Sequence, residues 1–255
     1  MSAFNWSGQY RAIAPFCNWI RQQPRYSWIR GVTLHHTDVP SLAQWAGQVS
    51  VNGLERYYRE TKRWSGGPHL FVASGTAARG LYDGVWQGTQ LDRQGVHAGD
   101  CNEHYLGLEF VGNYEAHPPT TAQKSDLFLV LDAIFDWLGL PVDINTLKGH
   151  RECMLERTCP GSAIDLNLLR AELRVMRSGQ PAPIAYQVAY DGCRFRKNPR
   201  LNSPITRQHN TGFQVQVMRV NVIGDQVALY GISDNKWAQT VEGDFIWQHL
   251  LRGDP

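Results

Sequence analysis

Long apolar runs and stripes of a single charge are both missing from this 255-residue sequence. A membrane-spanning helix needs about 20 consecutive apolar residues, and no stretch approaches that length, so we expect no insertion into a membrane. The 25 Lys and Arg residues are nearly balanced by 23 Asp and Glu, which gives a formal net charge of +2. A nucleic-acid-binding surface usually needs a dense basic stripe, so we expect no nucleic-acid partner.

Cysteine is scarce, and a recognisable export signal is missing. The five cysteines, at positions 17, 101, 153, 159 and 193, are an odd number at irregular spacings, which argues against a disulfide framework and predicts reduced thiols. The opening residues 1–23 lack the basic start, apolar run and small-residue cleavage site of a signal peptide. We therefore expect synthesis in the cytoplasm without ordinary export.

What is present indicates an α/β domain followed by a smaller one. Hydrophobic residues make up 42% of the chain, enough for one substantial core and a second small domain. In the first part of the chain, β-prone runs alternate with segments of helical periodicity. This alternation predicts a mixed central sheet flanked by helices, with strands at 31–34, 69–75, 80–82 and 105–111 and helices at 41–61, 120–138 and 163–176.

The segment 120–138 gives the strongest helix signal. Its apolar residues recur at the three and four spacing of one buried face. Thr120 and Gln123 can form a capping box at its start, and Gly139 can end it. The sequence therefore predicts both bounds of this helix.

The composition changes after Met176. Residues 177–187, RSGQPAPIAYQ, hold one Gly and two Pro with no periodicity, which is typical of a linker. From 188 to 255, short alternating runs are separated by Gly, Asp and Asn turns, and no helix pattern appears. The sequence predicts a domain at 1–176, a linker at 177–187 and a small all-β domain at 188–255.

Two histidines and a cysteine form a candidate metal site. His35 follows the β-prone run 31–34, and the segment 149–161 contributes His150 and Cys159. Zinc prefers imidazole and thiolate ligands, and a catalytic site needs only three of them, so that water can take the fourth position. A single His or Cys is more often an ordinary residue than a ligand, and this spacing alone does not identify a site.

Four motifs, in order along the chain, resemble those of the zinc-dependent N-acetylmuramoyl-L-alanine amidases of the type 2, or peptidoglycan recognition protein, superfamily. They are GVTLHHTDVP (31–40), GGPHLFVASG (66–75), GVHAG with YLGLEFVGNYE (95–99 and 105–115), and GHRECMLERTCPG (149–161). The resemblance implies one zinc ion (Zn2+) per chain, held by His35, His150 and Cys159. It further implies that peptidoglycan is the partner and that hydrolysis cleaves the amide bond between N-acetylmuramic acid and the first L-alanine of the stem peptide.

The same resemblance suggests roles for other polar residues. Pro68 stands where phage-type and recognition-protein amidases carry a Tyr, so we expect Glu109, which matches the glutamate of cytoplasmic-type amidases, to act as the general base. In an arbitrary protein, a strand carboxylate more often faces solvent or pairs with Arg. Arg157 stays protonated and is expected to stabilise the oxyanion. Substrate contacts are expected from His36, His69, His97 and Thr158.

The C-terminal part resembles a bacterial SH3-type wall-binding module, a small barrel. The resemblance rests on CRFRKNPRLNSP (193–204) and NKWAQTVEGDFIWQHLL (235–251). Trp237 and Trp247 could either stack on wall sugars or fill the core of such a barrel.

Three alternatives stay open at this point. The chain could be a recognition protein that binds peptidoglycan without cutting it. The zinc could be structural, with Cys153 closing the fourth position. The biological role could be that of a phage or prophage lysin, or that of a cell's own wall-remodelling or recycling amidase.

Overall fold

The computed structural model describes residues 4–76, 82–178 and 184–253. The chain divides into two compact units, residues 1–166 and 167–255, and each unit is described by itself. No helix within the described ranges is long and apolar enough to cross a membrane.

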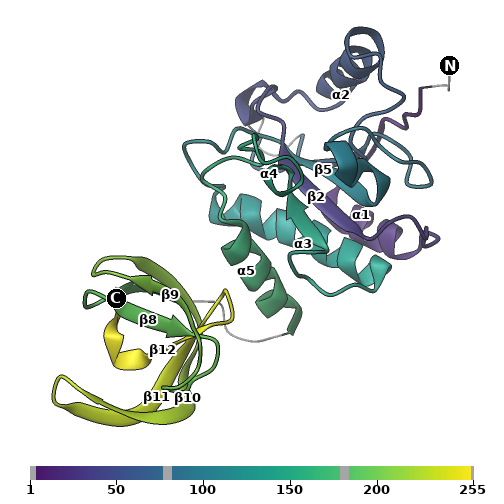
Figure 1. Ribbon diagram of the computed structural model, residues 1–255. Coiled ribbons are helices and arrows are strands. Elements are labelled where there is room, and N and C mark those ends of the chain that lie inside the picture. The colour runs from purple at the N-terminus through teal and green to yellow at the C-terminus, as the bar shows by residue number, and fades with distance from the viewer. Residues whose placement is uncertain (1–3, 77–81, 179–183, 254–255) are drawn as a thin grey trace. The chain divides into compact units, whose positions relative to one another are not determined.

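The first unit contains a six-stranded mixed sheet (Figure 1). Its strand order is β1-β4-β3-β5-β2-β6; β2 pairs parallel with β5 and β6, β3 pairs parallel with β5, and β4 pairs antiparallel with β1 and β3. The predicted mixed sheet is therefore confirmed. The bounds are β1 Gln9–Arg11, β2 Gly31–His36, β3 Leu70–Ala73, β4 Gly84–Gln87, β5 Tyr105–Phe110 and β6 Leu147–Gly149.

The strand predicted at 80–82 is corrected. Residues 80 and 81 lie outside the described residues, Tyr82 is not part of a strand, and β4 begins at Gly84.

The helix predicted at 41–61 is interrupted. A short 3-10 turn at Leu42–Gln44 (η1) precedes helix α2 at Gln48–Arg56, which continues into a π-helical turn at Tyr57–Thr61 (η2).

Helix α3 (Thr121–Leu138) confirms the strongest helix prediction. Thr120 Oγ1 accepts a hydrogen bond from the Gln123 amide at 3.3 Å, and Gln123 Oε1 accepts one from the Thr120 amide at 2.8 Å. Gly139, at φ +66°, ends the helix in the left-handed conformation that glycine adopts without strain. The apolar face is buried through Leu127, Val130, Leu131, Ile134 and Trp137.

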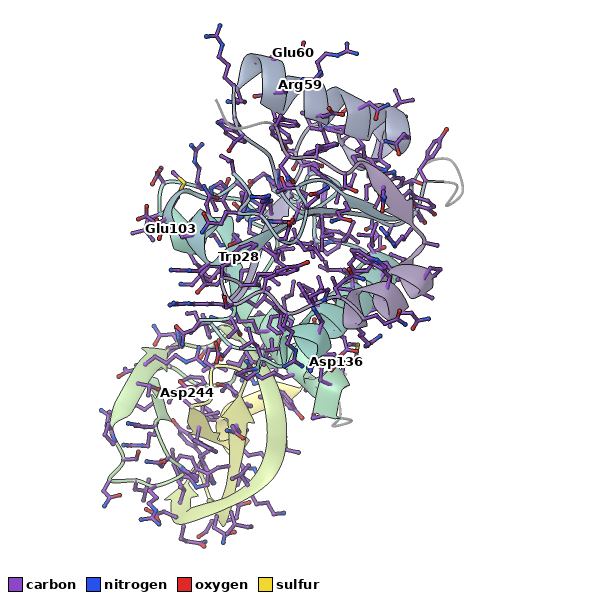
Figure 2. The ribbon with its side chains drawn as sticks, turned by 90° about the vertical axis from the view of Figure 1, so that its right-hand side faces the viewer. Trp28, Arg59, Glu60, Glu103, Asp136 and Asp244 are labelled. Atoms are coloured by element: carbon purple, nitrogen blue, oxygen red, sulfur yellow. A yellow bond between two sulfur atoms is a disulfide. The ribbon has the colours of Figure 1, made fainter. Side chains whose placement is uncertain are left out.

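Helix α1 (Ile13–Arg21) packs against α3, as Figure 1 shows. Arg21 pairs with two carboxylates of α3, at 3.2 Å from Asp132 and 3.1 Å from Asp136, which is labelled in Figure 2. The remaining helical segments of the first unit are the 3-10 turn η3 at Gly99–Glu103 and the short helix α4 at His150–Cys153. Helix α5 at Leu166–Ser178 confirms the helix predicted at 163–176 with shifted bounds. From residue 167 onward it belongs to the second unit, which therefore begins before the predicted domain end at 176 and contains a helix besides its sheet.

The parallel strands of the first unit place several polar residues at one end of the sheet. His35 of β2 and Glu109 of β5 are partners in the parallel register, so their side chains project from the same face. On the other side of β2, β6 ends at Gly149, and His150 follows at once. The carboxyl ends of adjacent parallel strands are a common place for a ligand site in α/β proteins.

The second unit contains a seven-stranded antiparallel sheet in the order β13-β7-β10-β11-β12-β8-β9. Its core includes Val188, Cys193, Phe195, Val215, Val217, Ala238 and Ile246. The bounds are β7 Ile184–Val188, β8 Cys193–Arg196, β9 Ile205–His209, β10 Gln214–Leu229, β11 Ile232–Thr240, β12 Phe245–Trp247 and β13 Leu251–Gly253, with a 3-10 turn, η4, at Gln248–Leu250.

The predicted linker at 177–187 is too long. Residues 179–183 lie outside the described residues, but Ile184–Val188 forms β7, which pairs with β10 and β13. Trp237 and Trp247 are both 2% exposed, so most of each side chain is packed in the core of the second unit. Their indole N–H groups donate to the Asp225 carbonyl and the Asp234 carboxylate.

The expectation of reduced thiols throughout is wrong for one pair. Cys101 of η3 and Cys153 of α4 form a disulfide, whereas Cys17, Cys159 and Cys193 are free. The two bonded cysteines are 52 residues apart in sequence, and only the packing of η3 near α4 brings them together. The odd count and irregular spacing could not reveal this contact.

Candidate metal centre

The structure brings the three expected metal ligands together. One ligand atom from each of His35, His150 and Cys159 lies within 4.8 Å of the others. The His35 Nδ1 and Cys159 Sγ atoms are 3.6 Å apart. Ordinary zinc bond lengths in a tetrahedral site would separate such a nitrogen and sulfur by about 3.6 Å, so these residues fit a zinc ion.

The histidines are in the form that binds a metal. Burial, followed by the neighbouring imidazoles, holds the pKa of His35 well below its usual range. Burial and then the positive charge of Arg157 lower the pKa of His150. Neutral imidazole is the metal-binding form, so neither ring has to lose a proton at neutral pH.

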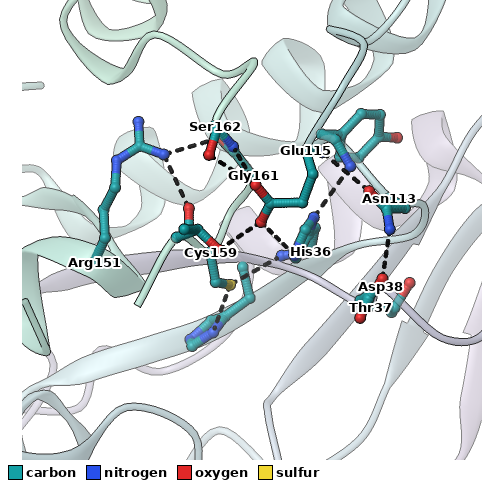
Figure 3. A network of polar contacts seen from close by, with 12 residues as sticks. His36, Thr37, Asp38, Asn113, Glu115, Arg151, Cys159, Gly161 and Ser162 are labelled. Atoms are coloured by element: carbon teal, nitrogen blue, oxygen red, sulfur yellow. Dashed lines mark hydrogen bonds and ion pairs between the residues drawn. The ribbon is translucent and has the colours of Figure 1, made fainter. Parts of the chain in front are cut away.

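Arg151 holds the loop that carries Cys159. Its guanidinium donates hydrogen bonds to the carbonyls of Thr158 at 3.1 Å and Gly161 at 2.9 Å (Figure 3). Its backbone amide donates to the Cys159 carbonyl at 2.8 Å. The thiol itself is desolvated: burial and then the charge of Glu109 raise the pKa of Cys159 to about 12. A bound cation would favour the thiolate, because metal coordination deprotonates a thiol.

Glu115 holds the same loop from the other side. Its carboxylate accepts hydrogen bonds from the hydroxyls of Thr158 at 2.6 Å and Ser162 at 2.7 Å (Figure 3). These bonds, the one from Thr158 first, lower the pKa of Glu115 to about 2. Neither Arg151 nor Glu115 was expected from the sequence to act at the site, although both lie in the quoted motifs, because loop-clamping contacts have no sequence signature of their own.

His36 supports this network and also lines the site. Its Nδ1 accepts a hydrogen bond from the Tyr114 amide at 3.1 Å, and its Nε2 lies 3.8 Å from the Glu115 carboxylate. Its backbone amide donates to Cys159 Sγ at 3.4 Å. The side chain is only 6% exposed. His36 therefore lies beside the cavity, as expected, and it also contacts the loop that carries Cys159.

The candidate centre opens into a cavity of about 420 Å³. Glu109 lines this cavity together with the three candidate ligands. Arg157 and Thr158 also line it, as their expected roles require, although the Thr158 hydroxyl already donates a hydrogen bond to the Glu115 carboxylate. A further wall is formed by Tyr57, Tyr58, Lys62 and Trp64.

Glu109 is a buried carboxylate with an unsatisfied oxygen. It is 8% exposed, and among the residues that the structure describes none donates a hydrogen bond to its Oε2. Burial raises its pKa to about 8. It therefore lines the cavity instead of the outer surface, and no Arg of the described residues forms an ion pair with it, so neither alternative for a strand carboxylate applies. A carboxylate held in this way at a cavity can exchange a proton near neutral pH.

His69 does not occupy the position expected of a substrate contact. The ring is fully buried, Nδ1 accepts a hydrogen bond from the Gly107 amide at 3.0 Å, and Nε2 donates to the Arg93 carbonyl at 2.9 Å. Both ring nitrogens are thus bonded to backbone. The expectation failed because the motif did not show that the His69 ring turns into the core.

His97 lines the cavity, but both of its ring nitrogens are also engaged. Nδ1 lies 3.1 Å from His35 Nε2, and Nε2 donates to the Tyr105 carbonyl at 3.1 Å. A substrate contact through either nitrogen would have to replace one of these bonds.

The alternative of Cys153 as a fourth metal ligand is corrected. Its disulfide with Cys101 leaves it no thiolate, so it cannot bind the metal.

Comparison with known proteins assigns the chain to a family. The family model described as N-acetylmuramoyl-L-alanine amidase matches residues 21–162. The human N-acetylmuramoyl-L-alanine amidase is 28% identical over 184 residues, which is 68% of this chain and 30% of the human protein. Peptidoglycan-recognition protein SC2 of Drosophila simulans is 27% identical over 141 residues, 54% of this chain and 71% of that protein. The chain thus spans about a third of the length of the mammalian relatives that it matches.

Solved structures with similar folds include a Drosophila recognition protein and a bacterial endolysin. Drosophila PGRP-SD gives a TM-score of 0.46 at 20% identity and covers 64% of this chain and 85% of its own. The endolysin N-acetylmuramoyl-L-alanine amidase LysCS from Clostridium intestinale gives 0.44 at 20% identity, with 59% and 92% covered. The family model itself matches 142 residues (21 to 162) of the 255, which is more than half. By this match, the chain belongs to the N-acetylmuramoyl-L-alanine amidase family.

Proposed function

We propose that this chain is a zinc-dependent peptidoglycan hydrolase that cleaves the amide bond between N-acetylmuramic acid and the L-alanine of the stem peptide. The observation that carries the proposal is the convergence of two imidazoles and a thiol beside an unpaired buried carboxylate. Membership in the amidase family supports the same reaction.

The roles of the residues follow from their chemistry. His35, His150 and Cys159 would hold a zinc ion, which when bound would supply Lewis acidity and lower the pKa of water towards neutrality. Glu109 accepts a proton from the attacking water and passes it to the leaving amine of L-alanine. Arg157, which keeps its positive charge, stabilises the negative charge that develops on the amide oxygen.

The cavity wall suits a substrate that joins a sugar to a peptide. Tyr57 is 43% exposed, and an exposed aromatic ring can stack on the apolar face of a sugar. The Lys62 ammonium lies 5.5 Å from the Tyr57 ring and 5.8 Å from the Trp64 ring, where it can attract a carboxylate of the stem peptide.

The main alternative is a recognition protein that binds peptidoglycan without cutting it. Cys159 and the unpaired Glu109 argue against it, because binding alone needs neither a metal-binding thiol nor a poised base. The alternative predicts that the purified chain binds soluble wall fragments and releases no free L-alanine amine from them.

The experiment compares two cysteine variants. Cys159→Ser should lose both bound zinc and amine release from soluble muropeptides, because a neutral hydroxyl replaces the thiolate ligand. Cys193→Ser is the matched control, because Cys193 is a buried free cysteine of the second unit, and it should keep both. Zinc is measured by elemental mass spectrometry. Zinc and turnover retained by Cys159→Ser would refute the proposal.

We also propose that the second unit is an SH3-like module that contacts the cell wall. Its β10–β11 turn exposes Leu229, Tyr230 and Ile232, and Tyr230 is 58% exposed and stacks on Tyr190 at 4.2 Å between ring centroids. In the inactive Cys159→Ser chain, Tyr230→Ala should reduce co-sedimentation with intact sacculi. Unchanged sedimentation would argue against this surface. The role as a phage or prophage lysin that reaches the wall at lysis stays a prediction from the sequence.

A further inference from the structure

His97 connects one candidate metal ligand to the backbone of the sheet. Its Nδ1 lies 3.1 Å from His35 Nε2, and its Nε2 lies 3.1 Å from the Tyr105 carbonyl oxygen. The His35 and His97 rings meet edge to face, with centroids 5.1 Å apart and an interplanar angle of 89°. The chain of contacts therefore runs from a backbone carbonyl through two imidazoles to the candidate metal position.

The Tyr105 carbonyl, at one end of this series of contacts, determines which atom is the donor in each hydrogen bond. A carbonyl oxygen only accepts, so His97 Nε2 must carry the proton that is donated to Tyr105. In a neutral ring, Nδ1 of His97 is then an acceptor. His35 Nε2 must donate to it, and this leaves the lone pair of His35 Nδ1 facing Cys159 Sγ, 3.6 Å away.

We propose that His97 is a positioning residue that fixes the tautomer and the ring orientation of His35, so that His35 Nδ1 is the atom presented to the metal. The inference rests on the proposed zinc site, and it adds a residue that is not itself a ligand but determines which nitrogen of His35 faces the metal. Partners that orient metal-binding imidazoles generally contribute about 10- to 100-fold to metal affinity.

The segment that carries His97 is itself held in place. The Asn102 side-chain oxygen accepts hydrogen bonds from the backbone amides of His97 at 2.8 Å and Ala98 at 2.7 Å. The Cys101–Cys153 disulfide joins this segment to α4, whose first residue is His150. The position of His97 is therefore fixed relative to both candidate histidine ligands.

The chain offers a matched control in His69. This ring is also internal and also has both nitrogens bonded, but its partners are the Gly107 amide and the Arg93 carbonyl. Its ring centroid lies 5.9 Å from that of His97. Removing His69 disturbs the same layer of the fold without removing a hydrogen bond to His35.

The decisive variants are His97→Asn and His97→Leu, which are nearly equal in size. Both lose the bond to Tyr105, but the Asn side-chain oxygen can take the place of Nδ1 as acceptor for His35, whereas Leu cannot. Zinc dissociation constants are measured by competition with a chelator. We expect His97→Leu to weaken zinc binding by about 10- to 100-fold, and His97→Asn and His69→Leu to stay within about 3-fold of the wild type.

The outcomes separate the positioning role from the proposed function. Equal zinc affinity for His97→Leu and His97→Asn, or an equal loss in His69→Leu, would overturn the positioning role while zinc binding by the wild type still stood. A wild-type chain that binds no zinc and releases no amine would instead overturn the proposed function.

A measurement on the unmodified protein covers the case in which a variant fails to fold. Long-range 1H–15N NMR spectra of the zinc-loaded chain distinguish the two nitrogens of each imidazole. We expect a proton on Nε2 of both His35 and His97 and none on Nδ1 of either ring. A proton on Nδ1 of His97 would overturn the inference.

Discussion

Glu109 of the first unit and Asp244 of the second are carboxylates of similar burial in opposite surroundings. Glu109 is 8% exposed and Asp244 is 6% exposed. Asp244, labelled in Figure 2, accepts hydrogen bonds from Arg207 Nε at 2.9 Å and from the hydroxyls of Thr206 and Thr240. Within the described parts of the chain, nothing donates to Glu109 Oε2. The two carboxylates are thus buried to a similar extent, but of the two only Asp244 has hydrogen-bond donors for both of its oxygens within the described residues.

The difference extends to the neighbours of each carboxylate. Burying an ionisable group without partners costs free energy, so a fold usually pairs such groups unless another requirement prevents it. In the second unit, Asp234 likewise accepts from Trp247 at 2.8 Å and pairs with His249 at 2.6 Å. The unpaired carboxylate stands instead beside a cavity and a candidate metal centre. This difference agrees with the proposed role of Glu109 as a general base and with a stabilising role for Asp244.

The sharpest test of this comparison is Glu109→Gln. We expect turnover of soluble muropeptides to fall by about 10³-fold, within the range for removal of a general base, because an amide cannot accept the proton of the attacking water. Bound zinc should be retained. The melting temperature should not fall, because the substitution removes a buried ionisable group that lacks a partner. Steady-state kinetics, elemental analysis and calorimetry measure the three quantities.

The comparison would break if Glu109→Gln kept its turnover or lost its zinc. Retained turnover would remove Glu109 from the reaction. Lost zinc would mean that the carboxylate holds the metal and not the proton.

The reciprocal variant is Asp244→Asn. We expect it to destabilise the second unit by about 3 kcal/mol, the low end of the range for breaking a buried ion pair, because 22% of the Arg207 side chain is exposed. Turnover of soluble muropeptides should not change. Hydrogen exchange detected by mass spectrometry reads the amides of β11 and β5 separately. Faster exchange in β5 alone would contradict the assignment of Asp244 to the stability of the second unit.

The sequence predicted those parts of the molecule that depend on local patterns. The bounds of α3 followed from apolar periodicity and from the capping residues Thr120 and Gly139. The convergence of His35, His150 and Cys159 was also expected, but only through the family resemblance, because a His and a Cys nine residues apart do not by themselves define a site.

What the sequence could not predict depends on side-chain direction and on long-range contacts. Both His69 and His97 lie in family motifs, yet the His69 ring turns into the core, where it bonds to backbone, and the His97 ring turns towards His35. The Cys101–Cys153 disulfide joins segments whose proximity arises only from folding. The linker prediction failed because Ile184–Val188 gains its strand partners from β10 and β13, which lie far along the chain.

The smallest expected effect is a change of stability with pH that differs between the two units. Burial lowers the pKa of His69 to about 4, below its ordinary value of 6.5. Between these values the unfolded chain protonates this ring and the folded chain does not, so His69 alone should cost the first unit about 1.4 kcal/mol of stability per pH unit as the pH falls from 6.5 towards 4. The buried His35 and His97, whose pKa values are also lowered, add to this slope. Above 6.5 this contribution is fully present.

His69→Gln should reduce this slope by about 1.4 kcal/mol per pH unit, because Gln does not titrate, even if it lowers stability at neutral pH. The measurement is hydrogen exchange of β5 amides against pH, with a chelator present so that proton competition for the metal does not contribute. Exchange in β11 should change less, because His209 of the second unit is partly exposed and so loses less hydration on folding. An unchanged slope in His69→Gln would assign the acid sensitivity to other groups and would weaken the contrast between the two units.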